Sequence, residues 1–159
     1  MIARGIATVL GVGLLRPAPG TWGSLAALPL AWLAMQAGAA AFTALVVVLL
    51  PLAWWSIARA TQGTADHDPS EIVVDEVAGQ WIALLPIAWG AQSAGVPPAA
   101  LWPGWLAAFA LFRLFDVWKP GPVGWADRRA DALGVLLDDV VAGLLAALGV
   151  VLLAGLAHL

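Results

Sequence analysis

The stretch AAAFTALVVVLLPLAWWSIARA, residues 39–60, decides the fold class of this chain. It overlaps a run, residues 17–58, that contains no Asp, Glu, Lys or Arg, and residues 77–112 and 140–159 are equally free of these charges. A helix needs about 20 apolar residues to cross a bilayer. The first two runs are therefore long enough for two crossings each and the third for one, which predicts a polytopic membrane protein with about five hydrophobic helices.

The overall composition agrees with a membrane protein. Hydrophobic residues make up 62% of the chain, charged residues only 11%, and the mean hydropathy is +0.92. Soluble domains are closer to half apolar and a quarter charged. The net charge of −3 argues against a nucleic-acid partner, because binding phosphates requires a basic surface. The length of 159 residues fits a single domain over residues 1–159.

Proline, glycine and polar residues divide the chain into an all-α pattern. The predicted helices cover residues 24–36, 39–60, 75–89, 101–118 and 134–159. Ser24 is the expected N-cap of the first helix. The fourth helix is expected to stop at Lys119-Pro120, because proline cannot continue a helix. The polar loops 61–74 and 121–133 separate the hydrophobic segments.

The basic residues predict how the helical bundle is oriented. All seven lie in or beside the N-terminal segment and the two polar loops: Arg4, Arg16, Arg59, Arg113, Lys119, Arg128 and Arg129. The turns at residues 36–40 and 92–100 contain none. Cytoplasmic loops of membrane proteins carry an excess of Lys and Arg. We therefore expect the polar loops on one face of the membrane, in the cytoplasm, and the uncharged turns on the other.

All ten acidic residues lie between Asp66 and Asp139, and four of them form two adjacent pairs. The pairs are Asp75-Glu76 and Asp138-Asp139. Gly79 and Gly143 follow the pairs at helical spacing, and small residues allow two helices to approach closely. Two such helices would gather carboxylates suited to Mg²⁺ or Mn²⁺. The alternative is that these acids pair with Arg or Lys, as intramembrane acids often do.

Two further groups admit both a structural and a functional interpretation. Arg113, Asp116 and Lys119 recur every three residues, as in a salt-bridge ladder or in a phosphate-binding site with Asp116 facing a metal. The segment PGTWGS, residues 19–24, precedes a predicted helix, so its backbone N–H groups are suited to binding an anion. On its own this second signal is weak.

The chain has no cysteine, which excludes a thiolate nucleophile.

Taken together, four motifs resemble the phosphatidylglycerophosphatase A family, bacterial membrane enzymes that dephosphorylate phosphatidylglycerophosphate. They are GLLRPAPGTWGSLA (13–26), DPSEIVVDEVAGQW (68–81), FRLFDVWKPGP (112–122, continuing to Trp125, Asp127 and Arg128) and GVLLDDVVAG (134–143). They span nearly the whole chain in the family's order and spacing. One departure is Asp131-Ala132, where the family usually has a Gly-Gly pair.

The resemblance implies an all-helical, Mg²⁺-dependent phosphatase in the bacterial inner membrane, with its active site facing the cytoplasm. Its product would be phosphatidylglycerol, and its partners the phospholipid substrate and the bilayer. The expected catalytic residues are Asp75, Glu76, Asp116, Lys119 and Asp139. The expected metal ligands are Asp75, Glu76, Asp138 and Asp139. The expected substrate-binding residues are Gly20, Thr21, Gly23, Ser24, Arg113 and Arg128.

No side chain is an obvious nucleophile, so we expect water to attack the phosphorus directly. Two other functions fit the same pattern. A non-catalytic protein that binds or transports cations would also gather carboxylates, although it would be expected to bury them at the bilayer midplane. A phosphatase acting on another lipid phosphate would share the metal site and differ in its headgroup contacts.

Overall fold

The structure is a computed structural model that describes residues 1–64, 66 and 68–157, and within these ranges it contains helices and no strand. The elements are α1 (Ile2–Ala7), η1 (Val12–Leu14), α2 (Pro19–Met35), α3 (Ala39–Ala60), α4 (Val74–Ala83), α5 (Leu85–Ala94), η2 (Pro98–Leu101), α6 (Trp102–Trp118), α7 (Pro122–Asp127) and α8 (Ala132–Leu156). The predicted all-α fold is confirmed.

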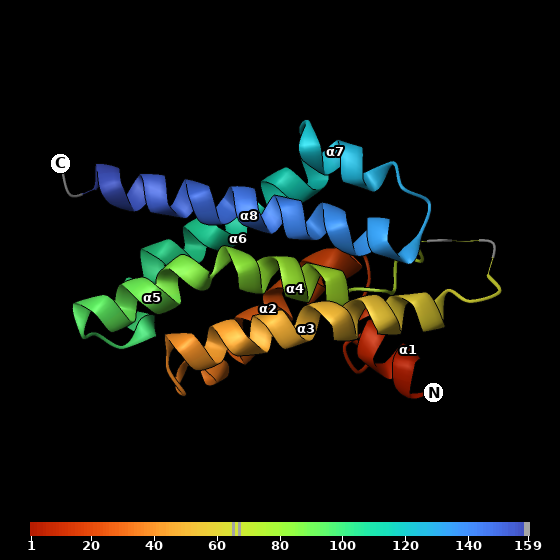
Figure 1. Cartoon of the computed structure of the whole chain (residues 1–159), viewed down its shortest axis with the longest axis horizontal. Coiled ribbons are helices and arrows are strands. Elements are labelled where there is room, and N and C mark those ends of the chain that lie inside the picture. The colour runs from red at the N-terminus through yellow and green to blue at the C-terminus, as the bar shows by residue number, and fades with distance from the viewer. Residues whose placement is uncertain (65, 67, 158–159) are drawn as a thin grey trace.

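The long helices run back and forth along one axis, so that the polar loops gather at one end (Figure 1). The end of α3, the start of α4 and the segment around α7 lie at this end, close to the N-terminus. The short turns after α2 and α5 lie at the opposite end, close to the end of α8. This arrangement confirms that the polar loops share one face of the bundle.

Three helical segments of the described chain are long and apolar enough to cross a membrane: Ala39–Ala60, Pro98–Trp118 and Ala132–Leu156. Helix α2, with 17 residues, and the pair α4–α5, with 10 residues each, run along the same axis but are shorter or interrupted. The chain is therefore built as a membrane protein, and the predicted count of about five helices describes the bundle only loosely.

Proline explains the largest difference between the predicted and observed helices. The predicted helix 75–89 is two helices that meet at Leu84, because Pro86 has no N–H and its ring clashes with the preceding turn. The second helix continues to Ala94 and ends at Gly95, whose φ of 65° suits glycine. The predicted end of the fourth helix is confirmed: α6 stops at Trp118, and Lys119 has a φ of 50°.

Two helices begin earlier than predicted, and one helix was not expected. Helix α2 starts at Pro19, so Ser24 is not its N-cap; the Ser24 hydroxyl donates to the Gly20 carbonyl oxygen at 2.9 Å. Helix α8 starts at Ala132, because the Asp131 side chain accepts a hydrogen bond from the Gly134 N–H at 2.8 Å and caps the helix. The predicted loop 121–133 contains the short helix α7.

Glycine allows α4 and α8 to pack backbone against backbone, which was predicted from the sequence. A Cβ atom on Gly143 would overlap the carbonyl oxygen of Gly79. A Cβ atom on Gly79 would overlap the Phe112 ring and the carbonyl oxygen of Asp139. This contact places the acidic residues of α4 next to those of α8.

Candidate metal and phosphate site

Three carboxylates from α4 and α8 meet at the polar end of the bundle. Asp75, Glu76 and Asp139, here called the carboxylate triad, each contribute an oxygen, and these oxygens all lie within 4.8 Å of one another. Asp75 and Asp139 are buried, with only 5% and 3% of their surface exposed, and Glu76 is half-buried. The first turn of α4 supplies two members, and the close contact at Gly79 brings the third from α8.

The triad lacks the hydrogen bonds that buried carboxylates normally have. Asp75 Oδ1, Glu76 Oε2 and Asp139 Oδ1 are buried and have no hydrogen-bond partner among the residues that the structure describes. Burying an uncompensated carboxylate costs several kcal/mol, and neighbouring like charges add to that cost. A cation between the three oxygens would offset both terms. The donors are hard oxygens, so the triad fits a metal ion such as Mg²⁺ or Mn²⁺.

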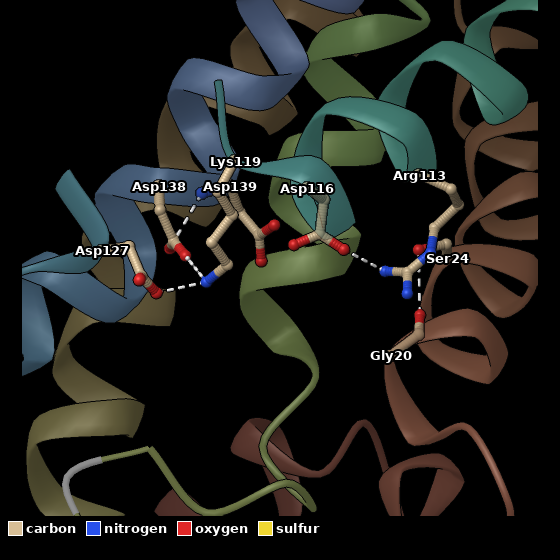
Figure 2. A network of polar contacts seen from close by, with 8 residues as sticks. All are labelled: Gly20, Ser24, Arg113, Asp116, Lys119, Asp127, Asp138 and Asp139. Carbon is tan, nitrogen blue, oxygen red and sulfur yellow. Dashed lines mark hydrogen bonds and ion pairs between the residues drawn. The ribbon is translucent and has the colours of Figure 1, made fainter. Parts of the chain in front are cut away.

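Lys119 holds a separate group of acids beside the triad. Its Nζ donates to Asp138 Oδ2 at 2.8 Å and to Asp127 Oδ1 (Figure 2); these three residues are here called the lysine cluster. Partial burial lowers the pKa of Lys119, but the hydrogen bonds to Asp127 and Asp138 outweigh this effect and raise the pKa above its ordinary value. Lys119 is therefore protonated at neutral pH.

Asp138, expected as a fourth metal ligand, is placed with Lys119 and lies outside the triad. One of its oxygens accepts from Lys119, and the other accepts the N–H of Asp139 at 3.0 Å. Neighbouring residues on a helix point about 100° apart. For this reason the adjacent acids Asp138 and Asp139 face different partners.

Arg113 and Asp116 form an ion pair along α6. The carboxylate of Asp116 lies between the Arg113 guanidinium and Asp139 (Figure 2). Gly20 of α2 lies against both the triad and this pair, since a Cβ atom there would overlap Glu76 Oε1 and lie 3.3 Å from an Arg113 guanidinium nitrogen. The site therefore joins α2, α4, α6 and α8.

The other expected substrate-binding residues differ in their burial and in their partners. Thr21 is half-buried in the first turn of α2. Gly23 and Ser24 are buried further along the helix; Gly23 packs against Val73, and Ser24 is bonded to Gly20. Arg128 is exposed after α7 and forms no ion pair within the described part of the chain.

Sequence reasoning gave Asp127 no role of its own, although it binds Lys119. Asp127 is the last residue of α7, eight positions after Lys119. Helix α7 folds back after Pro120-Gly121, and this brings the carboxylate to the ammonium group. The only signal in the sequence was the position of Asp127 in the continuation of the third motif, next to Arg128.

Comparisons with known proteins agree with this arrangement. The family model "Phosphatidylglycerophosphatase A" matches residues 5–154. Proteins named phosphatidylglycerophosphatase A from Haemophilus influenzae and Escherichia coli are 36% and 32% identical over 143 residues, which is 89% of this chain and 82% and 77% of theirs. No solved structure gives a significant match.

A third relative carries a different name. A Bacteroides thetaiotaomicron protein, provisionally named a phosphatidylinositol-3-phosphatase, is 39% identical over 145 residues, covering 87% of this chain and 84% of its own length. The family match nevertheless covers almost the whole chain and includes all the site residues described above. The chain therefore belongs to the phosphatidylglycerophosphatase A family.

Proposed function

We propose that this protein hydrolyses the phosphomonoester of phosphatidylglycerophosphate, releasing phosphatidylglycerol and inorganic phosphate, and that residues 1–159 act as one catalytic domain. The observation that carries the proposal is the carboxylate triad, whose buried oxygens lack partners in the described chain, next to the cations Lys119 and Arg113. The two relatives named phosphatidylglycerophosphatase A support the choice of substrate.

Asp75, Glu76 and Asp139 are proposed to hold Mg²⁺. All three supply carboxylate oxygen, and Mg²⁺ in proteins is usually bound through carboxylates, water and substrate phosphates. A bound Mg²⁺ would supply Lewis-acid polarisation of the phosphate and a water more easily deprotonated than free water. The assignment of Asp138 differs from the expectation above, because its oxygens are used by Lys119 and by the Asp139 N–H.

Arg113 and Lys119 are proposed to bind the phosphate oxygens. Arg113 has five N–H donors and Lys119 has three, so both keep free donors after pairing with Asp116, and with Asp127 and Asp138. The carboxylates hold the two cations in position. The absence of a side chain at Gly20 lets Glu76 and Arg113 approach the first turn of α2, whose N–H groups are proposed to donate to the phosphate bound by Arg113.

The reaction follows as direct hydrolysis. The oxygen of a water molecule bonds to phosphorus, and the bond between phosphorus and the glycerol oxygen breaks. The water loses a proton and the glycerol oxygen gains one, so the products are phosphatidylglycerol and inorganic phosphate. Positive charge from Arg113 and Lys119 stabilises the negative charge that spreads over the phosphoryl oxygens in the transition state. None of these steps needs a side-chain nucleophile.

The position of the site suits a lipid substrate. The triad and both cations lie at the polar end of a bundle whose long helices are apolar along their outer faces. The acyl chains would remain in the bilayer while the headgroup reaches the charged end. We place this end in the cytoplasm and the protein in the inner membrane, because the basic residues gather there.

Phosphate release from phosphatidylglycerophosphate by the purified full-length protein in detergent tests the proposal. We expect release with Mg²⁺ and none with excess EDTA. Full activity in EDTA would overturn the metal assignment. Binding of Mg²⁺ without hydrolysis of any lipid phosphate would favour a cation-binding or transport protein instead.

A second substrate is worth a parallel assay because of the Bacteroides relative. Phosphatidylinositol-3-phosphate also carries a phosphomonoester, on a bulkier headgroup. We expect phosphatidylglycerophosphate to have the higher kcat/KM. The reverse order would keep the chemistry of the site and change the substrate.

A further inference from the structure

Gln80 is a fully buried polar residue to which the proposed reaction gives no role. Its side chain has 0% exposure, and neither its amide oxygen nor its amide nitrogen has a hydrogen-bond partner within residues 1–64, 66 and 68–157. Buried amides in proteins are nearly always hydrogen-bonded, and each exception requires an explanation. The neighbouring positions Ala78, Ile82 and Ala83 of α4 are buried and apolar, so a methionine or leucine would suit the packing better.

The position of Gln80 on α4 relates it to the carboxylate triad. Gln80 follows Glu76 by four residues, so both lie on the same face of the helix, one turn apart. Side chains on a helix lean toward its N-terminus, which directs the Gln80 amide toward the turn that carries Asp75 and Glu76. Besides the Gln80 amide, the buried side-chain atoms without a partner on the described α4 are Asp75 Oδ1 and Glu76 Oε2, which belong to the triad.

The chemistry of a carboxamide suits an outer position around a cation. The triad already concentrates three acids, and a fourth carboxylate would add to their repulsion. An amide oxygen accepts a hydrogen bond without adding charge. Mg²⁺ usually keeps several of its waters, and these need acceptors where the surroundings are apolar.

We propose that Gln80 is a positioning residue of the metal site, whose amide oxygen accepts a hydrogen bond from a water molecule bound to the cation. This inference rests on the proposed function, since it assumes that the triad binds Mg²⁺. It explains why a polar side chain is kept in an apolar part of α4, at a cost to the stability of the metal-free protein.

The test uses full-length protein in detergent and Gln80→Met, which is close to glutamine in shape and lacks its polar atoms. Mg²⁺ affinity is measured by titration calorimetry, and unfolding temperature is measured in EDTA and in Mg²⁺. We expect Gln80→Met to weaken Mg²⁺ binding about tenfold or more, as changes in outer-shell partners do. In EDTA the variant is expected to unfold at the same or a higher temperature than the wild type, because an unpartnered amide has been removed.

Gln92→Met is the matched control. The Gln92 amide oxygen accepts the N–H of Ala39 at 3.0 Å, at the uncharged end of the bundle. Its removal should lower the unfolding temperature and leave Mg²⁺ affinity unchanged. Gln80→Glu, which keeps an acceptor oxygen, should bind Mg²⁺ at least as tightly as the wild type.

The outcomes separate the inference from the proposed function. If the wild type binds Mg²⁺ and Gln80→Met binds it equally well, the role of Gln80 is overturned while the metal site stands. A lower unfolding temperature of Gln80→Met in EDTA, with unchanged Mg²⁺ affinity, would assign Gln80 a structural role and also overturn the inference. If the wild type does not bind Mg²⁺, both the metal site and the inference are wrong.

Discussion

The carboxylate triad and the lysine cluster lie next to each other, yet their acids are treated in opposite ways. In the lysine cluster, Asp127 and Asp138 bind an ammonium group supplied by the chain itself. In the triad, Asp75, Glu76 and Asp139 are packed together with buried oxygens that have no partner within the described residues. A paired acid contributes to stability without help, whereas an unpaired buried acid costs stability until a cation arrives. The difference distinguishes acids that shape the site from acids that are proposed to bind metal.

The largest expected effect comes from neutralising one triad member. Asp139→Asn should lower metal-dependent phosphate release by about a thousandfold, because a metal contributes several kcal/mol to such a transition state. In EDTA the variant should unfold at a higher temperature than the wild type, since one of three repelling carboxylates is gone. Phosphate assays and thermal unfolding in detergent measure the two effects.

Asp131→Asn is the control for this change. Asp131 is half exposed, and asparagine also caps helices, so activity should be unaffected. Wild-type activity of Asp139→Asn, or a strong loss of stability in EDTA, would show that the triad is a structural cluster and not a metal site.

A substitution in the lysine cluster should affect stability with the opposite sign. Lys119→Met removes a cation proposed to bind phosphate and leaves Asp138, whose side chain is only 9% exposed, without its partner. We expect kcat/KM to fall about a hundredfold, the size typical of losing one transition-state contact. We also expect the unfolding temperature to fall in EDTA and in Mg²⁺ alike.

Lys119→Arg keeps the positive charge and should retain stability better than Lys119→Met, although the guanidinium has a different shape. A metal-free Lys119→Met variant that is more stable than the metal-free wild type would show that the ion pairs of the lysine cluster do not stabilise the protein. The contrast with the triad would then be wrong.

The contact between α4 and α8 should be sensitive to a single methyl group. Gly143→Ala places a Cβ atom against the carbonyl oxygen of Gly79, and such overpacking costs about 1–3 kcal/mol. Moving the helices apart also separates Asp139 from Asp75, so Mg²⁺ affinity should fall together with stability. Denaturant unfolding and Mg²⁺ titration measure both.

Gly155 on the same helix provides the control, because a Cβ atom there meets nothing within 4 Å. Gly155→Ala should be neutral or slightly stabilising, as alanine is the better helix former. Equal effects of the two substitutions would contradict the importance of the close approach.

The smallest effect is expected at the cap of α8 and should depend on pH. Hydrogen bonds from Arg129 and from the Gly134 N–H lower the pKa of Asp131. Its stabilising effect is therefore present above its unfolded-state pKa of about 3.9 and is lost as the pH falls through the lower folded-state value. Asp131→Ala should slightly lower the unfolding temperature at neutral pH, and the difference from the wild type should shrink below about pH 4.

Asp131→Asn separates the cap from the charge, because it keeps an acceptor for the Gly134 N–H and cannot titrate in this range. A difference between Asp131→Ala and the wild type that stayed constant down to low pH would contradict this account. None of the cap variants should change the rate of phosphate release, since Asp131 lies outside the triad and the lysine cluster.

Much of the fold was predictable, and the errors have identifiable causes. Residues 39–60 and 101–118 were predicted almost to the residue, because their ends are marked by glycine, proline and charge. Helix α2 starts earlier than predicted, at Pro19, because proline suits the first position of a helix. The break at Leu84 was missed because the apolar pattern continues across it.

For the candidate site, the sequence indicated which residues lie at one end of the bundle but not how they group. It singled out both acidic pairs, Arg113, Lys119 and Gly20, and the structure brings all of them to one end of the bundle. It treated Asp138 and Asp139 as equivalent, and it assigned no separate role to Asp127 or Gln80. These distinctions depend on which neighbour each side chain faces.

By itself, the sequence determined that this is an all-helical membrane protein with its charges at one end. The cost of placing a charge in a bilayer depends on the residues of each segment and not on the segments packed against it. Only the tertiary structure decided which acids meet. The backbone contact of Gly79 with Gly143 brings Asp139 to Asp75 and Glu76, while the turn after α6 carries Lys119 to Asp138. Adjacent helix positions point about 100° apart. Asp138 and Asp139 therefore face different partners: Asp139 joins the candidate metal site, and Asp138 pairs with Lys119.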